Sequence, residues 1–441
     1  MTSDPQQSCS ALGEAKKTLQ LLLISHEDKQ SEDLSQGGSL DKSEFEKTQW
    51  RKVKELLSHC GSLDKSDRIN LLMFIAAEHA SDLSKQLFKE STGINTQDGA
   101  LQLPSSMVFE RIAASEGGLK FMLDLRTNLL AHLKKVNDLD EIIMFEQMSS
   151  TLKTLFSNWF SVSSLQLDRV TLDSSPEQLL ERVGALEAVH PVRDQAELEA
   201  RVGKYRRCFV FTHPGLPGEP LVIFHVALTE EIKSSLSDLI ARDTERSSQK
   251  QDEEELERIK AAMFYSISST QPGLAGLGLA SHLIEGSVAR LLAEFPSLET
   301  FATLSPIPGF RSWLLELLTK KLLLLTKKEE EVVTVEEAAV IEATLGAGEP
   351  HLLLLTLLKS ISHLPDNKDL AKLRPVVCRL AARYLCLEKK RWAAAALNPV
   401  ANFHLSNGAT VWRINWMADG SLKGMDASFG LMVNYRYFLD R

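Results

Sequence analysis

The sequence predicts an α+β protein in which an N-terminal helical bundle is followed by an α/β domain with a mixed sheet. Between residues 45 and 165, apolar residues recur three and four positions apart, which is typical of amphipathic helices that pack together. After residue 205, short apolar runs bounded by glycine and proline alternate with helical patterns, which indicates strands joined through helices. The spacing of the apolar residues changes near residue 165, so we place the domain border between residues 168 and 169.

The region 45–168 contains no set of residues that suggests catalysis. Its histidines His59, His79 and His132 occur singly, and we interpret them as structural or surface residues. A helical bundle without chemistry often serves as a platform for assembly, so we expect an oligomerisation domain here. Residues 1–44 are mostly polar, and we expect a loose N-terminal segment there, apart from a short apolar run at Leu19–Ile24.

The composition excludes some classes of function. The 441 residues carry a formal net charge of −9, which argues against nucleic-acid binding, and no apolar run is long enough to span a membrane. The five cysteines form no Cys-x-x-Cys pair, so we expect no metal site and a reducing compartment. The first residues lack the pattern of a secretory signal, and we expect an intracellular protein. An anionic ligand would need a local basic patch, and one cluster stands out ahead of a strand: Arg201, Lys204, Arg206 and Arg207.

Residues 261–310 hold the most informative pattern. The predicted order is a strand at Met263–Ser269, a loop of small residues at Gln271–Gly278, a helix from Leu279 to Phe295 and a strand at Thr300–Leu304. Unpaired N–H groups at the start of a helix, together with the helix dipole, favour an anion such as a phosphate. The spacing Gly273-x-x-Gly276-x-Gly278 matches neither the dinucleotide fingerprint nor a Walker loop, so a packed turn explains the loop equally well.

Two polar residues near the ends of predicted elements are candidates for chemistry. Pro306 and Pro308 stop the second strand, so the hydroxyl of Ser305 is held rigidly at its end. The alternative is a serine that only shapes the turn. His404 is expected in a loop that leads into a strand, among asparagines of a type that orients imidazoles: Asn398, Asn402 and Asn407. A lone histidine in a loop usually has no special role, so this assignment also has a structural alternative.

The remaining predicted elements complete the α/β region. A hairpin is expected from strands at Cys208–Phe211 and Leu221–Leu228, and helices are expected at 175–188, 195–203 and within 311–390. The last two strands are expected at Thr410–Trp416 and Leu431–Phe438. The second of these alternates between apolar and polar residues, so we expect it to have one buried and one polar face.

With these segments assembled, the chain closely resembles the malonyl-CoA decarboxylase family. The resemblance covers roughly residues 45–440, and it is carried by long, unusual strings. They are YRRCFVFTHPGLPGEPLVIFHVAL, FYSISSTQPGLAGLGLASHLI, FATLSPIPGF followed by Trp313, and LNPVANFHLSNGATVWRINWMADGSLKG ending in NYRYFL. The helical region matches more loosely, at residues 117–130 and in LFSNWF.

The resemblance implies an N-terminal helical domain used for tetramer assembly and a catalytic domain, residues 169–441, like that of the GNAT acyl-CoA acetyltransferases. In such a domain the loop after the central strand holds the CoA pyrophosphate. The next strand, Phe301–Ser305 here, splays away to admit the pantetheine arm. The loop residues that would bind malonyl-CoA are Ala275, Gly276, Leu277, Gly278, Leu279, Ala280 and Ser281. Tyr437 of NYRYFL is a further candidate for the same pocket.

The resemblance also implies the reaction, which converts malonyl-CoA to acetyl-CoA and CO2 in fatty-acid metabolism. The catalytic serine and histidine of the family carry over to Ser305 and His404. We expect the loss of CO2 to leave a thioester enolate whose oxyanion meets preorganised donors, so that no metal or cofactor is needed beyond the CoA of the substrate. The histidine would then protonate C2. We expect no acyl-serine, because decarboxylation needs no nucleophile.

The chain departs from the family pattern in two places. Some members carry an acidic residue in the loop where this chain has Gly278. Family chains usually continue past NYRYFL and often end in Ser-Lys-Leu, whereas this sequence ends at Asp440-Arg441, so we expect the C-terminal end of the catalytic domain to be incomplete. The resemblance implies a mitochondrial, peroxisomal or cytoplasmic location, and no targeting signal is readable in the chain.

Two other functions remain open at this point. An acyl-CoA N-acyltransferase on the same scaffold would transfer the acyl group to an amine and would need a general base beside the thioester. A non-catalytic malonyl-CoA sensor or scaffold would bind the thioester without turnover, and the missing loop carboxylate motivates this alternative. The presence of both Ser305 and His404 argues against it.

Overall fold

A computed structural model describes residues 5–32, 42–91, 103–192, 194–240, 257–323, 331–360, 367–390 and 395–438. The chain divides into two compact units. The first contains Met1–Asp168, Phe211–Val222 and Ser269–His282, and the second contains Arg169–Val210, Ile223–Ser268 and Leu283–Arg441. Two later segments of the chain belong to the first unit, and the domain border expected at residues 168–169 stays a prediction.

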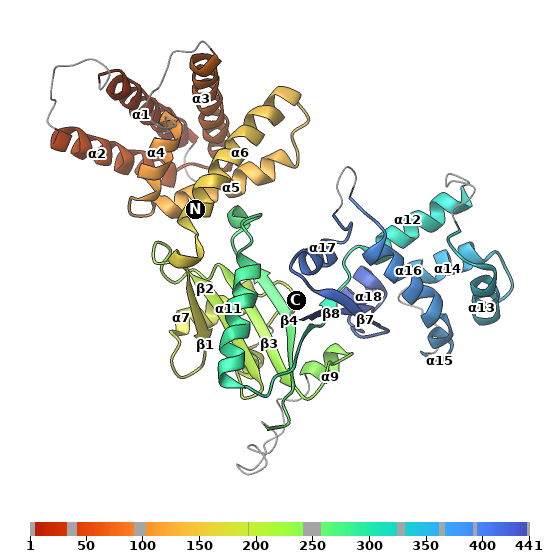
Figure 1. Ribbon diagram of the computed structural model, residues 1–441. Helices are drawn as coiled ribbons and strands as arrows, with labels where there is room; N and C mark the ends of the chain where they lie inside the picture. Colours follow the sequence, from red (N-terminus) through yellow and green to blue (C-terminus); the bar gives the residue numbers. More distant parts are fainter. Residues whose placement is uncertain are drawn as a thin grey trace. The chain divides into compact units, whose positions relative to one another are not determined.

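The first unit is mainly helical (Figure 1). Its helices are α1 (Pro5–Glu32), α2 (Lys42–Gly61), α3 (Lys65–Ser91), α4 (Pro104–Ala113), α5 (Gly118–Leu133) and α6 (Leu139–Trp159), followed by the short 3₁₀ turn η1 (Val162–Ser164). They bury a shared apolar core that includes Val53, Leu72, Phe109, Leu129 and Phe145. The helical character predicted for residues 45–165 is therefore confirmed, while its use in oligomerisation stays a prediction.

The expectation of a loose segment at residues 1–44 is wrong for residues 5–32, which form α1. Ala15, Leu19 and Leu22 of this helix are buried. Their spacing of four and three residues puts them on one helix face, and burial of that face offsets the entropy of ordering a polar segment. His79 is buried and bonds to the hydroxyls of Ser105 and Thr151, as expected of a structural histidine.

A mixed sheet forms the centre of the second unit. Its described strands are β1 (Gln166–Val170), β2 (Arg206–Thr212), β3 (Val222–Thr229), β4 (Ala261–Ser269), β5 (Thr300–Thr303), β6 (Ser305–Pro306), β7 (Thr410–Asn415) and β8 (Met432–Tyr437). Their order is β1-β2-β3-β4-β5-β8-β6, with β7 paired to β8. β4 and β5 run parallel, whereas β8 is antiparallel to β5, β6 and β7. The predicted α+β class and the predicted strands are confirmed.

Helices cover both faces of this sheet. Side chains of neighbouring residues on a strand point to opposite faces, and β2 shows what covers each. Cys208 packs in a cluster with Val183 of α7 (Glu177–Leu186) and Leu198 of α8 (Gln195–Arg201). Arg207 instead pairs with Glu294, the last residue of α11 (Leu279–Glu294), which runs along the sheet (Figure 1).

The prediction that the last strand has one polar face is wrong. Met432 to Tyr435 are all buried, because β8 lies between other strands and is covered on both sides. Asn434 compensates for its burial by donating its amide hydrogens to the carbonyls of Thr303 and Lys233.

The helices predicted within residues 311–390 are confirmed where the structure describes them. They are α12 (Phe310–Leu322), α13 (Val335–Leu345), α14 (Pro350–Lys359), α15 (Asn367–Leu370), η5 (Ala371–Leu373) and α16 (Arg374–Cys386). Three shorter helices, α9 (Leu236–Ile240), α17 (Pro399–Ser406) and α18 (Leu422–Ser428), complete the unit. Among the described helices, no single one has the length and hydropathy to cross a membrane, although α13 and α14, which meet at a bend of 54°, pass that test as a pair.

Candidate active site

Ser305 lies where two parallel strands part. β4 and β5 are paired from Ala261↔Thr300 to Phe264↔Thr303, and the Leu304 N–H still bonds to the Phe264 carbonyl. β4 then continues to Ser269, whereas the chain after Thr303 turns to pair with β8, where Ser305 faces Val433. Pro306 and Pro308 have no backbone N–H, which prevents a longer strand. The serine is therefore held at the strand end, as the sequence predicts.

His404 is on a helix, so the expectation of a loop position is wrong. α17 begins with Asn398 as its N-cap, whose side chain accepts a hydrogen bond from the Ala401 N–H at 2.8 Å. Pro399 follows in the first helical position, a combination that starts helices. The Asn398 amide also donates to the Pro308 carbonyl at 2.9 Å. Asn398 thus ties the helix that carries His404 to the turn that follows Ser305, rather than orienting the imidazole directly.

The structure brings Ser305, His404 and Tyr437 together in one hydrogen-bonded chain. His404 Nε2 lies 3.3 Å from Ser305 Oγ, and His404 Nδ1 lies 2.8 Å from the Tyr437 hydroxyl. Ser305 Oγ donates to Thr303 Oγ1 at 2.9 Å, and the Tyr435 N–H donates to the same oxygen at 3.0 Å. Because the serine hydrogen is directed to Thr303, Ser305 Oγ accepts from an Nε2–H, and a neutral imidazole then accepts from Tyr437 at Nδ1.

Burial sets the protonation states of His404 and Tyr437. Ser305 is 6% exposed and His404 4% exposed. Burial lowers the pKa of His404 to about 3, so the imidazole is neutral at pH 7. Burial also raises the pKa of the Tyr437 phenol, which therefore keeps its proton. His404 and Tyr437 are therefore uncharged at pH 7, and the site holds neutral hydrogen-bond donors.

Thr303 and Tyr435 belong to the site but escaped the sequence prediction. The Tyr435 ring stacks on the imidazole of His404, with centroids 4.6 Å apart and planes inclined by 27°. Thr303 accepts both hydrogen bonds described above. Thr303 belongs to the string FATLSPIPGF and Tyr435 to NYRYFL, so proximity to the motif residues was the available signal.

The loop with the predicted phosphate-binding role belongs to the first unit. The 3₁₀ turn η3 (Pro272–Leu274) and the start of α11 flank it, and Gly276 and Gly278 have positive φ values of 81° and 72°. A side chain is strained in that conformation, which explains glycine at both positions. The seven residues Ala275–Ser281 thus form the expected turn from strand to helix.

The arginines of the basic cluster at residues 201–207, which stands out in the sequence, are not an open anion site. Arg201 is 6% exposed and pairs with Glu197 at 2.6 Å. Arg207, also 6% exposed, pairs with Glu294 at 2.5 Å. The Arg206 guanidinium bonds to the Leu239 carbonyl. These cations already have partners inside the protein, since a buried charge without one is costly.

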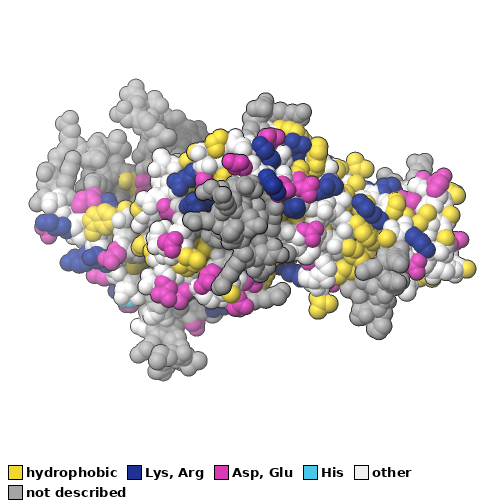
Figure 2. Space-filling model, turned by 90° about the horizontal axis from the view of Figure 1, so that it is seen from below, with side chains coloured by type: hydrophobic (Ala, Val, Ile, Leu, Met, Phe, Trp, Pro, Cys, Tyr) yellow, Lys and Arg dark blue, Asp and Glu magenta, His cyan; other side chains and the backbone are white. Residues whose placement is uncertain are grey.

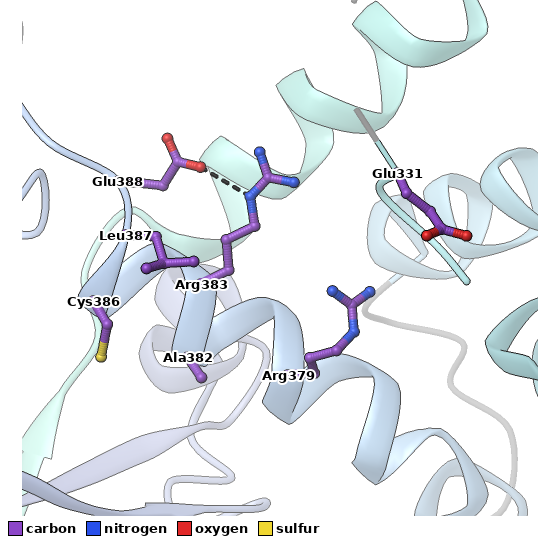
Figure 3. Close-up of a pocket in the computed structure, with 7 residues that line it drawn as sticks. All are labelled: Glu331, Arg379, Ala382, Arg383, Cys386, Leu387 and Glu388. Carbon is purple, nitrogen blue, oxygen red and sulfur yellow. Dashed lines mark hydrogen bonds and ion pairs between the residues drawn. The ribbon is translucent and has the colours of Figure 1, made fainter. Parts of the chain in front are cut away.

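A hollow of about 720 Å³ lies beside α16, and it contains none of the predicted site residues. Arg379, Arg383 and Cys386 line it, and the Arg383 guanidinium pairs with Glu388 at 3.0 Å (Figure 3). Arg379 is paired with Glu337 through two nitrogens. Both arginines of the described lining are thus held by carboxylates, so neither is free to bind an anionic substrate. On the face that Figure 2 presents, acidic and basic side chains are likewise interspersed.

Comparison with known proteins identifies the family. The model of the malonyl-CoA decarboxylase C-terminal domain matches residues 163–441, and that of the N-terminal domain matches residues 89–160. The mitochondrial malonyl-CoA decarboxylase of Anser anser anser is 43% identical over 337 residues, which are 76% of this chain and 64% of the relative. That of Rattus norvegicus is 44% identical over 335 residues, or 76% of this chain and 65% of the relative. The chain thus spans slightly less than two thirds of the length of these relatives.

Solved structures agree with this. A crystal structure of malonyl-CoA decarboxylase from Rhodopseudomonas palustris has a TM-score of 0.73 and 27% identity, covering 97% of this chain and 93% of that one. The enzyme from Agrobacterium vitis gives a TM-score of 0.74 with 25% identity over the same shares of the two chains. On the family match across residues 163–441, which is more than half of its length, this chain belongs to the malonyl-CoA decarboxylase family.

Proposed function

We propose that the chain decarboxylates malonyl-CoA to acetyl-CoA and CO2, the activity for which its relatives are named. The observation that carries this proposal is the buried contact between Ser305 and His404, two motif residues that are 99 positions apart and lie 3.3 Å from each other. A serine with only a turn-forming role and a histidine with only a packing role would not be expected to form a buried hydrogen bond with each other.

The reaction needs hydrogen-bond donors rather than a nucleophile. The bond between C2 and the carboxylate carbon breaks, and its electron pair moves into the thioester, which becomes an enolate. Preorganised donors aimed at the enolate oxygen stabilise it by about 3–4 kcal/mol each. C2 then gains a proton, so that one proton is consumed in each turnover. No step in this scheme requires a metal or a cofactor other than the CoA of the substrate.

The proton relay in this proposal starts from neutral groups. With a pKa of about 3, His404 is not a standing imidazolium acid at pH 7, which refines the expectation from the sequence. Instead, the O–H of Ser305 and the N–H of His404 form a continuous series of donors with the Tyr437 hydroxyl. In turnover the Ser305 hydrogen turns from Thr303 to C2, Ser305 Oγ takes the Nε2 hydrogen of His404, and His404 Nδ1 takes the hydrogen of Tyr437, which regains one from solvent.

The remaining parts of the proposal follow the family. We propose that Ala275–Ser281 bind the diphosphate of CoA, that the helices of residues 45–168 assemble a homotetramer, and that the chain acts in fatty-acid metabolism. We also propose an intracellular location. The relatives from goose, rat and mouse are named as mitochondrial proteins, and we propose that compartment first.

The direct test is incubation of the purified protein with malonyl-CoA, with acetyl-CoA and CO2 as readouts. His404→Gln and Ser305→Ala should each lower kcat by about 10²–10⁴-fold, because each breaks the donor series, while CoA affinity measured by calorimetry stays unchanged. Ser287→Ala is the matched control, because this serine is also fully buried but lies on α11.

Three results would count against the proposal. Full activity of folded His404→Gln would remove the histidine from the mechanism. Binding of malonyl-CoA by the wild-type chain without acetyl-CoA formation would favour a sensor or scaffold. Acyl transfer to an added amine without release of CO2 would favour an N-acyltransferase.

A further inference from the structure

Arg126 of α5 is a buried cation without a carboxylate partner among the described residues. Its side chain is 2% exposed, and burial lowers its pKa. Its guanidinium carbon lies 5.5 Å from the ring centroid of Phe156. Buried charges are normally paired, as Arg201 and Arg207 are, because an uncompensated charge in the interior is expensive. Arg126 is instead held by two backbone carbonyls, and the loop to which they belong shows what this cation does.

Arg126 is bonded to the loop that follows β4. One terminal guanidinium nitrogen donates to the Gly273 carbonyl, and the other donates to the Ala275 carbonyl at 2.9 Å. Both the arginine and the loop belong to the first unit. The planar fork of a guanidinium fixes two acceptors at once, which a lysine ammonium does not do. Arg126 thus sets the path of the loop from Gly273 to Ala275.

The loop packs directly on α5 at the same place. A Cβ added to Gly273 would lie 2.4 Å from the Leu123 carbonyl and 2.9 Å from Thr127 Oγ1, so only glycine permits this approach. The Lys120 ammonium also reaches the Gln271 side chain, at 3.4 Å. The contact between helix and loop is therefore built from several residues along α5.

This anchoring decides where the loop amides point. In a trans peptide the carbonyl of one residue and the N–H of the next point in opposite directions. Since the Ala275 carbonyl is turned toward Arg126, the Gly276 N–H is turned away from it. No described residue accepts a hydrogen bond from this N–H. The Gly276 N–H is therefore a free donor on the side of the loop away from α5, and the positively charged guanidinium of Arg126 lies on the opposite side of the loop.

We propose that Arg126 makes the helical region part of the substrate site, by shaping the loop and by supplying the positive charge that faces the diphosphate of CoA. This inference rests on the proposed function, and it gives the N-terminal helices a role in substrate binding in addition to assembly. Arg126 is a positioning residue in this proposal, because it acts through the loop and does not touch the substrate.

The test compares two thioesters that differ only in the anionic part. Malonyl-CoA carries the diphosphate, whereas malonyl-pantetheine has the same thioester without it. Arg126→Gln should raise the KM for malonyl-CoA at least about tenfold, with kcat changed less than about threefold, and should leave kcat/KM for malonyl-pantetheine unchanged. Arg126→Lys keeps the charge but not the fork, and we expect an intermediate KM. Arg111→Gln is the matched control, since Arg111 lies on α4 and pairs with Glu46 away from the loop.

An equal loss of kcat/KM with both thioesters, or no loss with either, would overturn the inference. Should Arg126→Gln fail to fold in a thermal melt, the Arg126→Lys variant gives the same comparison. Calorimetric binding of free CoA separates this inference from the proposed function. If the wild-type chain binds CoA but does not decarboxylate malonyl-CoA, weaker CoA binding by Arg126→Gln still supports the anchor, and unchanged binding refutes it.

Discussion

The hydroxyl of Thr303 is expected to set the direction of the hydrogen-bonded chain in the candidate site. It accepts from Ser305 Oγ at 2.9 Å, and it also accepts from the Tyr435 N–H at 3.0 Å. Thr303→Val has nearly the same shape but no acceptor. Ser305 is then free to turn its hydrogen toward His404 Nε2, which would move the imidazole hydrogen to Nδ1. We therefore expect both a slower reaction and a change of tautomer at His404.

The size of the effect follows from the lost hydrogen bonds. A neutral hydrogen bond contributes about 0.5–1.5 kcal/mol net, so loss of the preferred Ser305 orientation should lower kcat by about 2- to 10-fold. The Tyr435 N–H loses its acceptor in a site where Thr303 is 1% exposed, which should lower the free energy of unfolding by about 1–3 kcal/mol. Proteins of this kind have about 5–15 kcal/mol of stability, so the variant should still fold.

Thr303→Ser is the matched control, because it keeps the oxygen and should retain the wild-type kcat. The rate is measured as acetyl-CoA formation at saturating malonyl-CoA. The tautomer is read from the imidazole nitrogen shifts of ¹⁵N-histidine-labelled protein, with His404→Gln identifying the signals. If folded Thr303→Val shows the same kcat and the same His404 tautomer as Thr303→Ser, the donor assignment is incorrect.

Two further predictions concern stability. Burial lowers the pKa of His404 to about 3 and that of His79 to about 4, so an unfolded chain binds more protons than the folded one below pH 6.5. The stability from these two groups is complete above pH 6.5 and is lost as the pH falls, by up to about 1.4 kcal/mol per pH unit for each group. The raised pKa of His225 acts in the opposite direction, so the test compares two proteins. The loss of stability between pH 7.5 and pH 5, measured by urea unfolding, should be larger in the wild type than in His404→Gln, and an equal loss in the two would contradict the prediction. The second prediction concerns a buried ion pair. Glu187→Gln should lower the free energy of unfolding by about 3–5 kcal/mol, because Glu187 Oε2 lies 3.3 Å from His225 Nε2 and both side chains are fully buried. Replacement of the exposed Glu299, which pairs with Lys260, should cost less than about 1 kcal/mol, and similar losses for the two variants would refute the difference.

Local signals predicted the strand–loop–helix–strand unit of residues 261–304 within about two residues at each boundary. Glycine and proline mark its turns, and the apolar runs give its strands, so little tertiary information was needed. The misplacement of His404 has a different cause. Asn398-Pro399 is a helix start and Gly408, with φ of 79°, is a helix stop, but three asparagines and a glycine within residues 398–408 resemble a loop.

Other features depend on contacts between distant residues and leave no local signal. Thr303 meets Tyr435 only because β5 and β8 pair in one register, with Phe301 opposite Tyr437. In the sequence, Arg201 and Arg207 look like a basic patch. The structure pairs them with Glu197 and Glu294. Arg126 gave no signal at all, since its role depends on carbonyl groups 147 and 149 residues away.

The direction of the hydrogen bonds narrows the chemistry that Ser305 and His404 perform in the proposed mechanism. A serine nucleophile must give its hydrogen to a basic imidazole, which requires Ser305 to donate to Nε2. Here the hydrogen is directed to Thr303, and the imidazole is neutral with a pKa of about 3, so it is a weak base. The same arrangement places donors in a buried site, which is what a developing enolate needs. A trapped acyl-enzyme, detected as a mass increase on a peptide that contains Ser305, would contradict this reasoning.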